Sequence, residues 1–145
     1  MKVASTLAAA SLAASFSAHA VTVTAKVVAD DYSSVFVGSE DGTSLTRVGG
    51  SNGALWCQQG GAFTFNVGAD DYIYVAARDS AVYGQPHMWI GEFNINDTQL
   101  VSNTTDWVSN YDASIKNPTL PNVQTLIQSG SWGGMGVSAA DSSSS

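Results

Sequence analysis

The chain has 145 residues, of which only 12% are charged; five lysines and arginines stand against twelve aspartates and glutamates, for a formal net charge of −7. Nucleic acids and anionic membranes are bound through clusters of Lys and Arg, which neutralise phosphates and release counterions. The composition therefore argues against both as partners, and an acidic surface poor in lysine suits an extracellular protein.

Residues 1–20 have the pattern of a secretory signal peptide. Lys2 provides a short basic start, Ala, Leu and Ser fill most of the stretch that follows, and Ala18-His19-Ala20 has the small-x-small form of a cleavage site. We expect cleavage after Ala20 and localisation outside the cell or at its surface. The remaining 125 residues carry a net charge of −8 and have the size of one domain. They contain no stretch apolar enough to span a bilayer, so we expect no membrane insertion of the mature chain.

Alternation of apolar and polar residues dominates the mature chain. In the segment Val21 to Val28, every second residue is Val or Ala, which predicts a half-buried strand. Further strands are expected at Ser33–Gly38, Ser44–Val48, Phe63–Val67, Tyr72–Ala77 and Met88–Ile95, with short pieces near Leu100 and Trp107. Turn residues separate them at spacings of about ten residues, so we predict an all-β fold, an antiparallel β-sandwich or jelly roll.

One short helix is expected late in the chain. Val123, Leu126 and Ile127 form an i, i+3, i+4 apolar stripe, with a start at Pro121 or Asn122 and an end at Gly130. We therefore assign residues 21–131 to the β-sandwich domain. Residues 132–145 are rich in Gly and Ser, which predicts a linker or a truncated end.

The tetrapeptide Ala-Asp-Asp-Tyr occurs twice, at residues 29–32 and 69–72, each time ahead of an apolar strand. Short carboxylates accept hydrogen bonds from nearby backbone N–H groups, so each copy predicts a turn that feeds a strand, and the two strand entries should be equivalent. Calcium, which binds carboxylate oxygens, is the alternative role for these side chains. The candidate residues for a calcium site are Asp30, Asp31, Asp70 and Asp71.

The sequence gives little sign of catalysis. A glycosidase needs two carboxylates at a defined separation, and adjacent aspartates at a strand entry point in divergent directions. Zinc and redox metals need several His or Cys ligands, whereas the mature chain contains only His87 and Cys57. Cys57 suits a buried thiol beside Trp56, and an intermolecular disulfide is the next reading. We therefore predict a protein that is not an enzyme and has no catalytic residues or required cofactor.

Aromatic residues provide the best indication of a ligand. The chain has four Trp and five Tyr, and exposed rings on β-proteins commonly stack on sugars while acidic and amide side chains bind the hydroxyls. Trp89 alternates with Gly91 and Phe93, which favours the core. Trp107 follows a polar stretch ending at Asp106, and Trp56 follows a Gly-rich loop. Trp107, Trp56 and Asp106 are therefore the candidate ligand contacts.

With this repeat and the runs Gln85–Asn94 and Leu100–Trp107 in view, the chain resembles secreted bacterial proteins of the exosortase-sorted (PEP-CTERM) group. The similarity covers most of residues 27–131. It implies an N-terminal domain like a galactose-binding-like jelly roll. The sorting tail of that group, a Pro-Glu-Pro motif followed by an apolar helix and a basic end, is absent from the printed sequence.

These features together favour a non-catalytic, secreted β-sandwich module that contacts carbohydrate or extracellular matrix. The alternative is a structural or adhesive surface subunit that acts by self-association or display. The sequence leaves open which ligand is bound, whether calcium binds and how many copies assemble.

Overall fold

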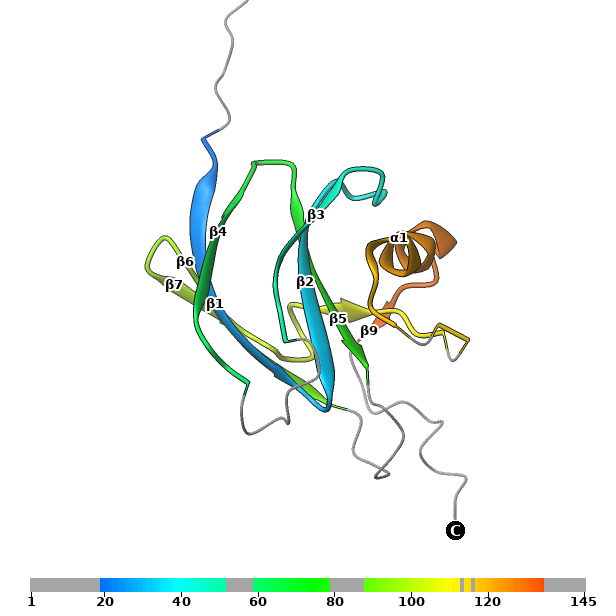
Figure 1. The fold of residues 1–145 in the computed structure, drawn as a ribbon. Coiled ribbons are helices and arrows are strands. Elements are labelled where there is room, and N and C mark those ends of the chain that lie inside the picture. Colours follow the sequence, from blue (N-terminus) through cyan, green and yellow to red (C-terminus); the bar gives the residue numbers. More distant parts are fainter. Residues whose placement is uncertain (1–18, 52–58, 79–87, 113, 116, 135–145) are drawn as a thin grey trace, which may run out of the picture.

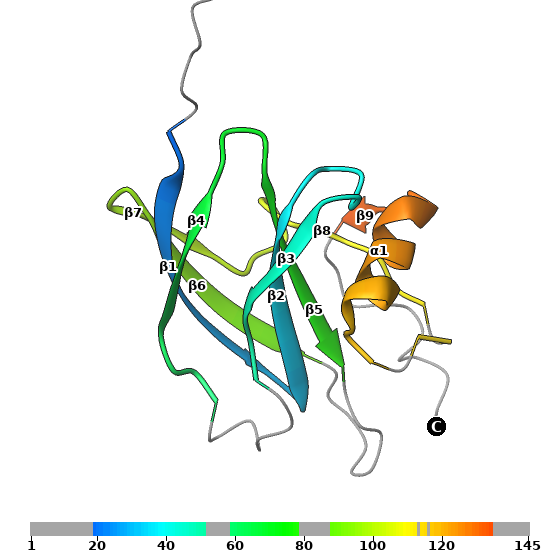
Figure 2. The ribbon, with the colours of Figure 1, turned by 45° about the horizontal axis from the view of Figure 1, so that its top comes forward.

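The computed structural model describes residues 19–51, 59–78, 88–112, 114–115 and 117–134. Two antiparallel sheets pack face to face, and a helix covers the outer side of the smaller sheet (Figures 1 and 2). The elements are β1 (Val21–Ala29), β2 (Tyr32–Gly38), β3 (Leu45–Gly49), β4 (Phe63–Val67), β5 (Tyr72–Arg78), β6 (Trp89–Ile95), β7 (Thr98–Val101), β8 (Val108–Ser109), α1 (Leu120–Ser129) and β9 (Gly133–Gly134). The predicted all-β sandwich with one short helix is confirmed.

The two main sheets share the strands unequally. The four-stranded sheet has the order β4-β1-β6-β7, the three-stranded sheet has the order β3-β2-β5, and β8 pairs with β9 in a small separate ladder. Every pairing is antiparallel. The chain passes from the first sheet to the second at the corner between β1 and β2, so these two strands lie on opposite sides of the core.

The core between the sheets is built from the inward positions of the alternating strands. From β1 come Val23, Ala25 and Val27, all at most 3% exposed, and from β2 come Val35 and Val37. Phe65 of β4 and Phe93 of β6 close the same cluster. The alternation that predicted the strands therefore also identifies the residues that hold the sandwich together.

Strand β2 is buried on both faces, unlike the other strands. Val35 points to the sandwich core, while the next residue, Phe36, points the other way and is 0% exposed. Its partners there are Val123 and Ile127 of α1. The molecule therefore has three layers, with the three-stranded sheet in the middle (Figure 2).

Helix α1 ends where the sequence predicts. Gly130 adopts the left-handed conformation, with φ of 67°, and its N–H donates to the Ile127 carbonyl oxygen at 3.1 Å. The helix begins at Leu120, one residue before Pro121, the first of the two predicted starting positions. Side-chain amides tie the helix to its surroundings: Gln124 donates to the Gly42 carbonyl at 3.0 Å, and Asn110 donates to the Leu126 carbonyl at 2.6 Å.

The folded chain continues past the expected domain boundary at Ser131. Gly133 and Gly134 form β9, which pairs with β8, and the Trp132 ring lies 6.4 Å from the ring of Tyr74. The Gly- and Ser-rich segment from residue 132, for which a linker or truncated end was predicted, thus begins with a short strand. Glycine forms the backbone hydrogen bonds of a strand like any other residue.

The β2–β3 turn is organised by one carboxylate. Asp41 accepts hydrogen bonds from the Ser39 hydroxyl at 2.6 Å, the Thr43 hydroxyl at 2.8 Å and the Thr43 N–H at 3.0 Å. These bonds, with the Ser39 hydroxyl contributing most, lower the pKa of Asp41 from 3.8 to about 2. The charged form is therefore favoured in the folded state.

We expect Asp41 to make the stability of this turn depend on pH. Because its folded pKa lies below its unfolded value, its contribution is fully present above pH 3.8 and is lost as the pH falls through 2. If the thermal midpoint is measured against pH, Asp41→Asn should show a smaller decrease of the midpoint at acidic pH than the wild type. A carboxyl carbon of Asp41 that titrates near 3.8 in an NMR experiment would contradict this prediction.

Candidate ligand-binding site

A pocket of about 420 Å³ lies on the outer face of the three-stranded sheet, where helix α1 begins. It is lined by Tyr32, Ser34, Phe36, Arg47, Ser51, Asn117, Pro118, Thr119 and Leu120. Alternation along β2 directs its even-numbered residues to this face, β3 contributes the arginine, and the segment leading into α1 supplies the opposite wall. Pockets of this size that combine apolar surface with a few polar groups commonly hold small ligands.

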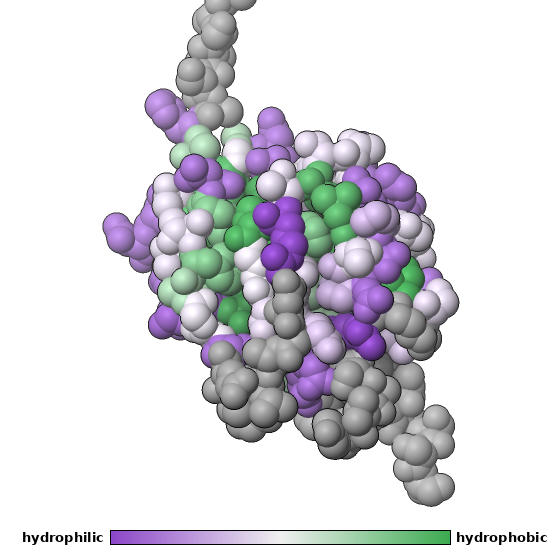
Figure 3. All heavy atoms as spheres, in the orientation of Figure 1, coloured by the Kyte–Doolittle hydropathy of each residue, from purple (hydrophilic) through white to green (hydrophobic). Residues whose placement is uncertain are grey.

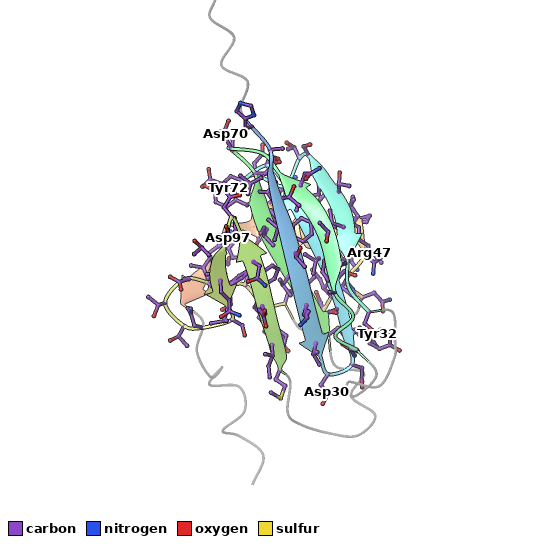
Figure 4. The ribbon with its side chains drawn as sticks, turned by 90° about the vertical axis from the view of Figure 1, so that its left-hand side faces the viewer. Asp30, Tyr32, Arg47, Asp70, Tyr72 and Asp97 are labelled. Atoms are coloured by element: carbon purple, nitrogen blue, oxygen red, sulfur yellow. The ribbon has the colours of Figure 1, made fainter. Side chains whose placement is uncertain are left out.

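The base of the pocket carries a buried hydroxyl that contacts an exposed arginine. Ser34 is only 4% exposed, and its Oγ accepts a hydrogen bond from Nε of Arg47 at 3.2 Å. Next to it on β2, the Ser33 hydroxyl accepts the N–H of Ser51 at 3.1 Å, which places Ser51 at the rim. In Figure 4, Tyr32 and Arg47 are labelled along the same edge of the molecule.

Arg78 braces two walls of the pocket from the neighbouring strand β5. Its guanidinium carbon lies 5.1 Å from the centroid of the Tyr32 ring, within the range of a cation–π contact. Its Nη1 donates to the Asn117 side-chain oxygen at 2.8 Å. Since both Tyr32 and Asn117 line the pocket, this single arginine links the start of β2 to the segment before α1.

Two arginines lie at or beside the pocket of a protein that is acidic overall. Its lining contains no aspartate or glutamate, and of the three basic residues that the structure describes, Lys26, Arg47 and Arg78, the two arginines lie at or beside it. Helix α1 also begins here, with no acidic residue in its first turn and no side-chain cap from Thr119. The positive end of the helix dipole therefore adds to the charge of the arginines.

Three aromatic rings lie in a row near the other end of α1. The Tyr72 and Tyr74 rings are 6.4 Å apart, and Trp132 follows at the same distance from Tyr74. Tyr72 is 48% exposed and Trp132 is 41% exposed. The hydroxyl of Tyr74 donates to the Ser39 carbonyl at 2.8 Å, and burial, followed by the charge of Glu40, raises the pKa of Tyr74. These rings form an open platform rather than a pocket.

Asp30 and Asp31 form the corner between the two sheets. Their N–H groups donate to the Met88 carbonyl at 3.1 Å and the Arg78 carbonyl at 2.9 Å. The Gln59 side chain spans the corner, because it accepts the N–H of Ala29 at 2.9 Å and donates to the Asp31 carbonyl at 2.6 Å. The predicted corner before β2 is therefore present, and Gln59 is a contributor that the sequence did not indicate.

Asp70 and Asp71 lie at the opposite end of the sandwich, as Figure 4 shows for Asp70 and Asp30. Asp71 accepts the N–H of Gly68 at 2.9 Å, which is the predicted turn-capping role. The four aspartates of the proposed calcium set thus do not form one site. Within the described ranges, no three His, Cys, Asp or Glu side chains come together where a metal ion could be held.

The two acidic repeats are separated because their strands are antiparallel neighbours. In the ladder between β2 and β5, Val35 pairs with Val75, whereas Tyr32 pairs with Arg78 at one end and Gly38 pairs with Tyr72 at the other. Both copies feed neighbouring strands of one sheet, but the expectation that the two strand entries are equivalent is wrong, because they lie at opposite ends of the ladder. Alternation within either strand does not reveal the strand directions.

Trp107 is not the exposed platform that its polar surroundings suggested. It is only partly exposed, its ring lies 5.2 Å from the rings of both Trp89 and Phe93, and its Nε1–H donates to the Val101 carbonyl at 2.9 Å. The ring packs against the edge of the core because a backbone carbonyl satisfies its polar atom there.

The polar residues before this tryptophan form a turn. Asp106 is exposed and accepts a hydrogen bond from the Asn103 side-chain amide at 2.6 Å, while the Asn103 oxygen accepts the N–H groups of Thr105 and Asp106. Trp56, Cys57 and His87 lie outside the described residues.

Sequence reasoning missed the residues that line the pocket. Once Val35 and Val37 are assigned to the core, alternation alone places Tyr32, Ser34 and Phe36 on the opposite face. The alternation along β2 would therefore have been enough to predict these three lining residues. The approach of Arg47 and Asn117 was not predictable, since it depends on the β2–β3 pairing and on where helix α1 packs.

Comparisons with known proteins assign no relative. No family model, no curated protein and no solved structure matches the chain. Among the described residues, no helix is long and apolar enough to cross a membrane.

Proposed function

We propose that this chain is a secreted, non-catalytic β-sandwich module that binds carbohydrate. The observation that carries the proposal is the pocket on the outer face of the three-stranded sheet, about 420 Å³ in volume. Sugars combine apolar C–H faces with hydroxyl groups, so they bind where aromatic surface lies beside hydrogen-bonding side chains. Tyr32 supplies the aromatic surface, and Arg47, Ser51 and Asn117 supply the hydrogen-bonding side chains.

Two further points support export and surface display. Strand β1 begins at Val21, directly after the expected cleavage site at Ala20, so removal of the leader would leave the sandwich whole. The resemblance to exosortase-sorted proteins, which are unified by export and display, points to the same location. Membership of that group is part of this proposal.

The first test is binding of the purified mature chain to a glycan array and to insoluble polysaccharides. Tyr32→Ala should weaken binding at least about tenfold, since the ring offers the apolar surface for stacking and holds Arg78 in place. Tyr111→Ala is the matched control, because Tyr111 is 76% exposed and does not line this pocket. It should leave binding unchanged. Both variants should be compared by thermal midpoint, so that unfolding is distinguished from lost contact.

Equal binding by the Tyr32 and Tyr111 variants would remove the pocket as the binding site. Absence of binding to every glycan by the folded wild-type chain would overturn the proposal as a whole.

The second candidate function, a structural subunit that self-associates, is favoured by one patch on the outer face of the four-stranded sheet. Val28 pairs with Ile90, which is 58% exposed, and Val101 on the same face is 43% exposed. If copies associate through this face, the apparent mass should rise with concentration in light scattering. Ile90→Lys should then return the chain to monomer, whereas Val108→Lys, at a residue 62% exposed on β8, should not.

A further inference from the structure

We propose that the pocket selects sugars that carry a carboxylate, that is, uronic acid units, over their neutral counterparts. This inference rests on the proposed carbohydrate binding and adds the class of ligand. A uronate has the same ring and hydroxyl groups as the neutral sugar, with one carboxylate in addition. The structure shows where that carboxylate would be favoured.

The first argument is the distribution of charge. The mature chain has four basic and twelve acidic residues, yet two of the three basic residues that the structure describes stand at one pocket whose lining has no carboxylate. Exposed charges further away than about 8 Å are largely screened at physiological salt. An anion in the pocket would therefore interact at close range with Arg47 and Arg78, while Asp31, which precedes Tyr32 and donates its N–H to the Arg78 carbonyl, lies outside the lining.

The second argument is the way the arginines are held. Nε of Arg47 donates to the buried Ser34 hydroxyl, which fixes the plane of the guanidinium at the pocket wall. Arg78 is fixed by the Tyr32 ring and by Asn117. A guanidinium that is already positioned loses less side-chain entropy on binding, and its planar fork matches a carboxylate.

The third argument is the wall opposite Arg47. Residues Asn117 to Leu120 lead into α1, and the first turn of the helix contains no acidic side chain. A carboxylate between this wall and Arg47 would face positive potential from both sides. A neutral sugar would keep the ring contacts and gain nothing from that potential.

The experiment measures binding of the mature chain to defined oligosaccharides of galacturonate, of galactose and of sulfated galactose by calorimetry at low and physiological salt. We expect the uronate oligomer to bind at least about tenfold more tightly than the neutral one, with the difference shrinking as salt rises. Arg47→Gln should abolish that preference while leaving weak binding of the neutral oligomer. Arg47→Lys should retain only part of it, because a lysine has the charge without the fork.

Lys26→Gln is the matched control, since it removes one positive charge from the outer face of the four-stranded sheet, remote from the pocket lining. A similar loss in the Lys26 and Arg47 variants would show a general charge effect and overturn the inference. Sulfated galactose that binds as well as the uronate would overturn selection of a carboxylate. Equal binding of neutral and uronate oligomers would overturn the inference and leave the proposed function standing, whereas binding of none of the three would overturn both.

Discussion

Phe36→Ala is expected to lower the free energy of unfolding by about 3–5 kcal/mol, the usual cost of truncating a fully buried phenylalanine. Phe36 is 0% exposed and is the buried residue through which β2 contacts Val123 and Ile127 of α1. Its removal leaves a cavity between the sheet and the helix. Because Val35 on the other face still packs in the sandwich core, the two sheets should remain together, while helix α1 loses its main packing contact with the sheet.

Urea unfolding measures the decrease in the free energy of unfolding, and amide hydrogen exchange shows which elements are destabilised. Amides of α1 should exchange faster in Phe36→Ala than in the wild type, with those of β1 and β6 affected less. Phe63→Ala is the control, since this phenylalanine is only half-buried at the edge of the sandwich core. An equal or larger loss in the Phe63 variant would refute the central role of Phe36.

Gly38→Ala should destabilise the chain by about 3 kcal/mol or more, at the upper end of what overpacking costs. A Cβ at Gly38 would coincide with the Ser44 carbonyl oxygen and would lie 2.6 Å from its carbon and 3.0 Å from the Cα of Leu45. These are backbone atoms, so no side-chain rotation can relieve the clash. The β2–β3 hairpin would have to open, at the expense of the bond from the Ser39 N–H to the Ser44 carbonyl.

Gly61→Ala is the matched control for this substitution, because a Cβ there meets nothing within 4 Å. We expect it to change the thermal midpoint little, whereas Gly38→Ala lowers it strongly or prevents folding. Comparable stability of the two variants would show that the hairpin is wider in solution than the structure has it.

Alternation with period two was enough to predict the fold class and most of the strands. It works for β1 because polar residues at Thr22, Thr24 and Lys26 mark one face as solvent-exposed. The helix was predictable for a similar reason, since Val123 and Ile127 lie on the stripe that becomes buried and Gly130 suits the left-handed end. Local patterns of this kind are set by neighbours in the sequence.

The candidate site was less predictable because it depends on contacts between distant parts of the chain. Trp107 has polar neighbours, and only its packing on Trp89 and Phe93 shows that it belongs to the edge of the core. Arg78 and Asn117 are 39 residues apart in sequence and meet at the pocket. No pattern within either segment predicts that these two residues are in contact.

The burial of β2 on both faces separates two kinds of evolutionary constraint along a single strand. Its odd-numbered residues Val35 and Val37 belong to the sandwich core, whereas Tyr32 and Ser34 on the other face line the pocket. Substitutions at Tyr32 and Ser34 can therefore change the lining of the pocket while the packing between the sheets stays intact. Strand β2 thus carries a core face and a pocket face, and homologues of this chain should vary at residues 32 and 34 more freely than at residues 35 and 37.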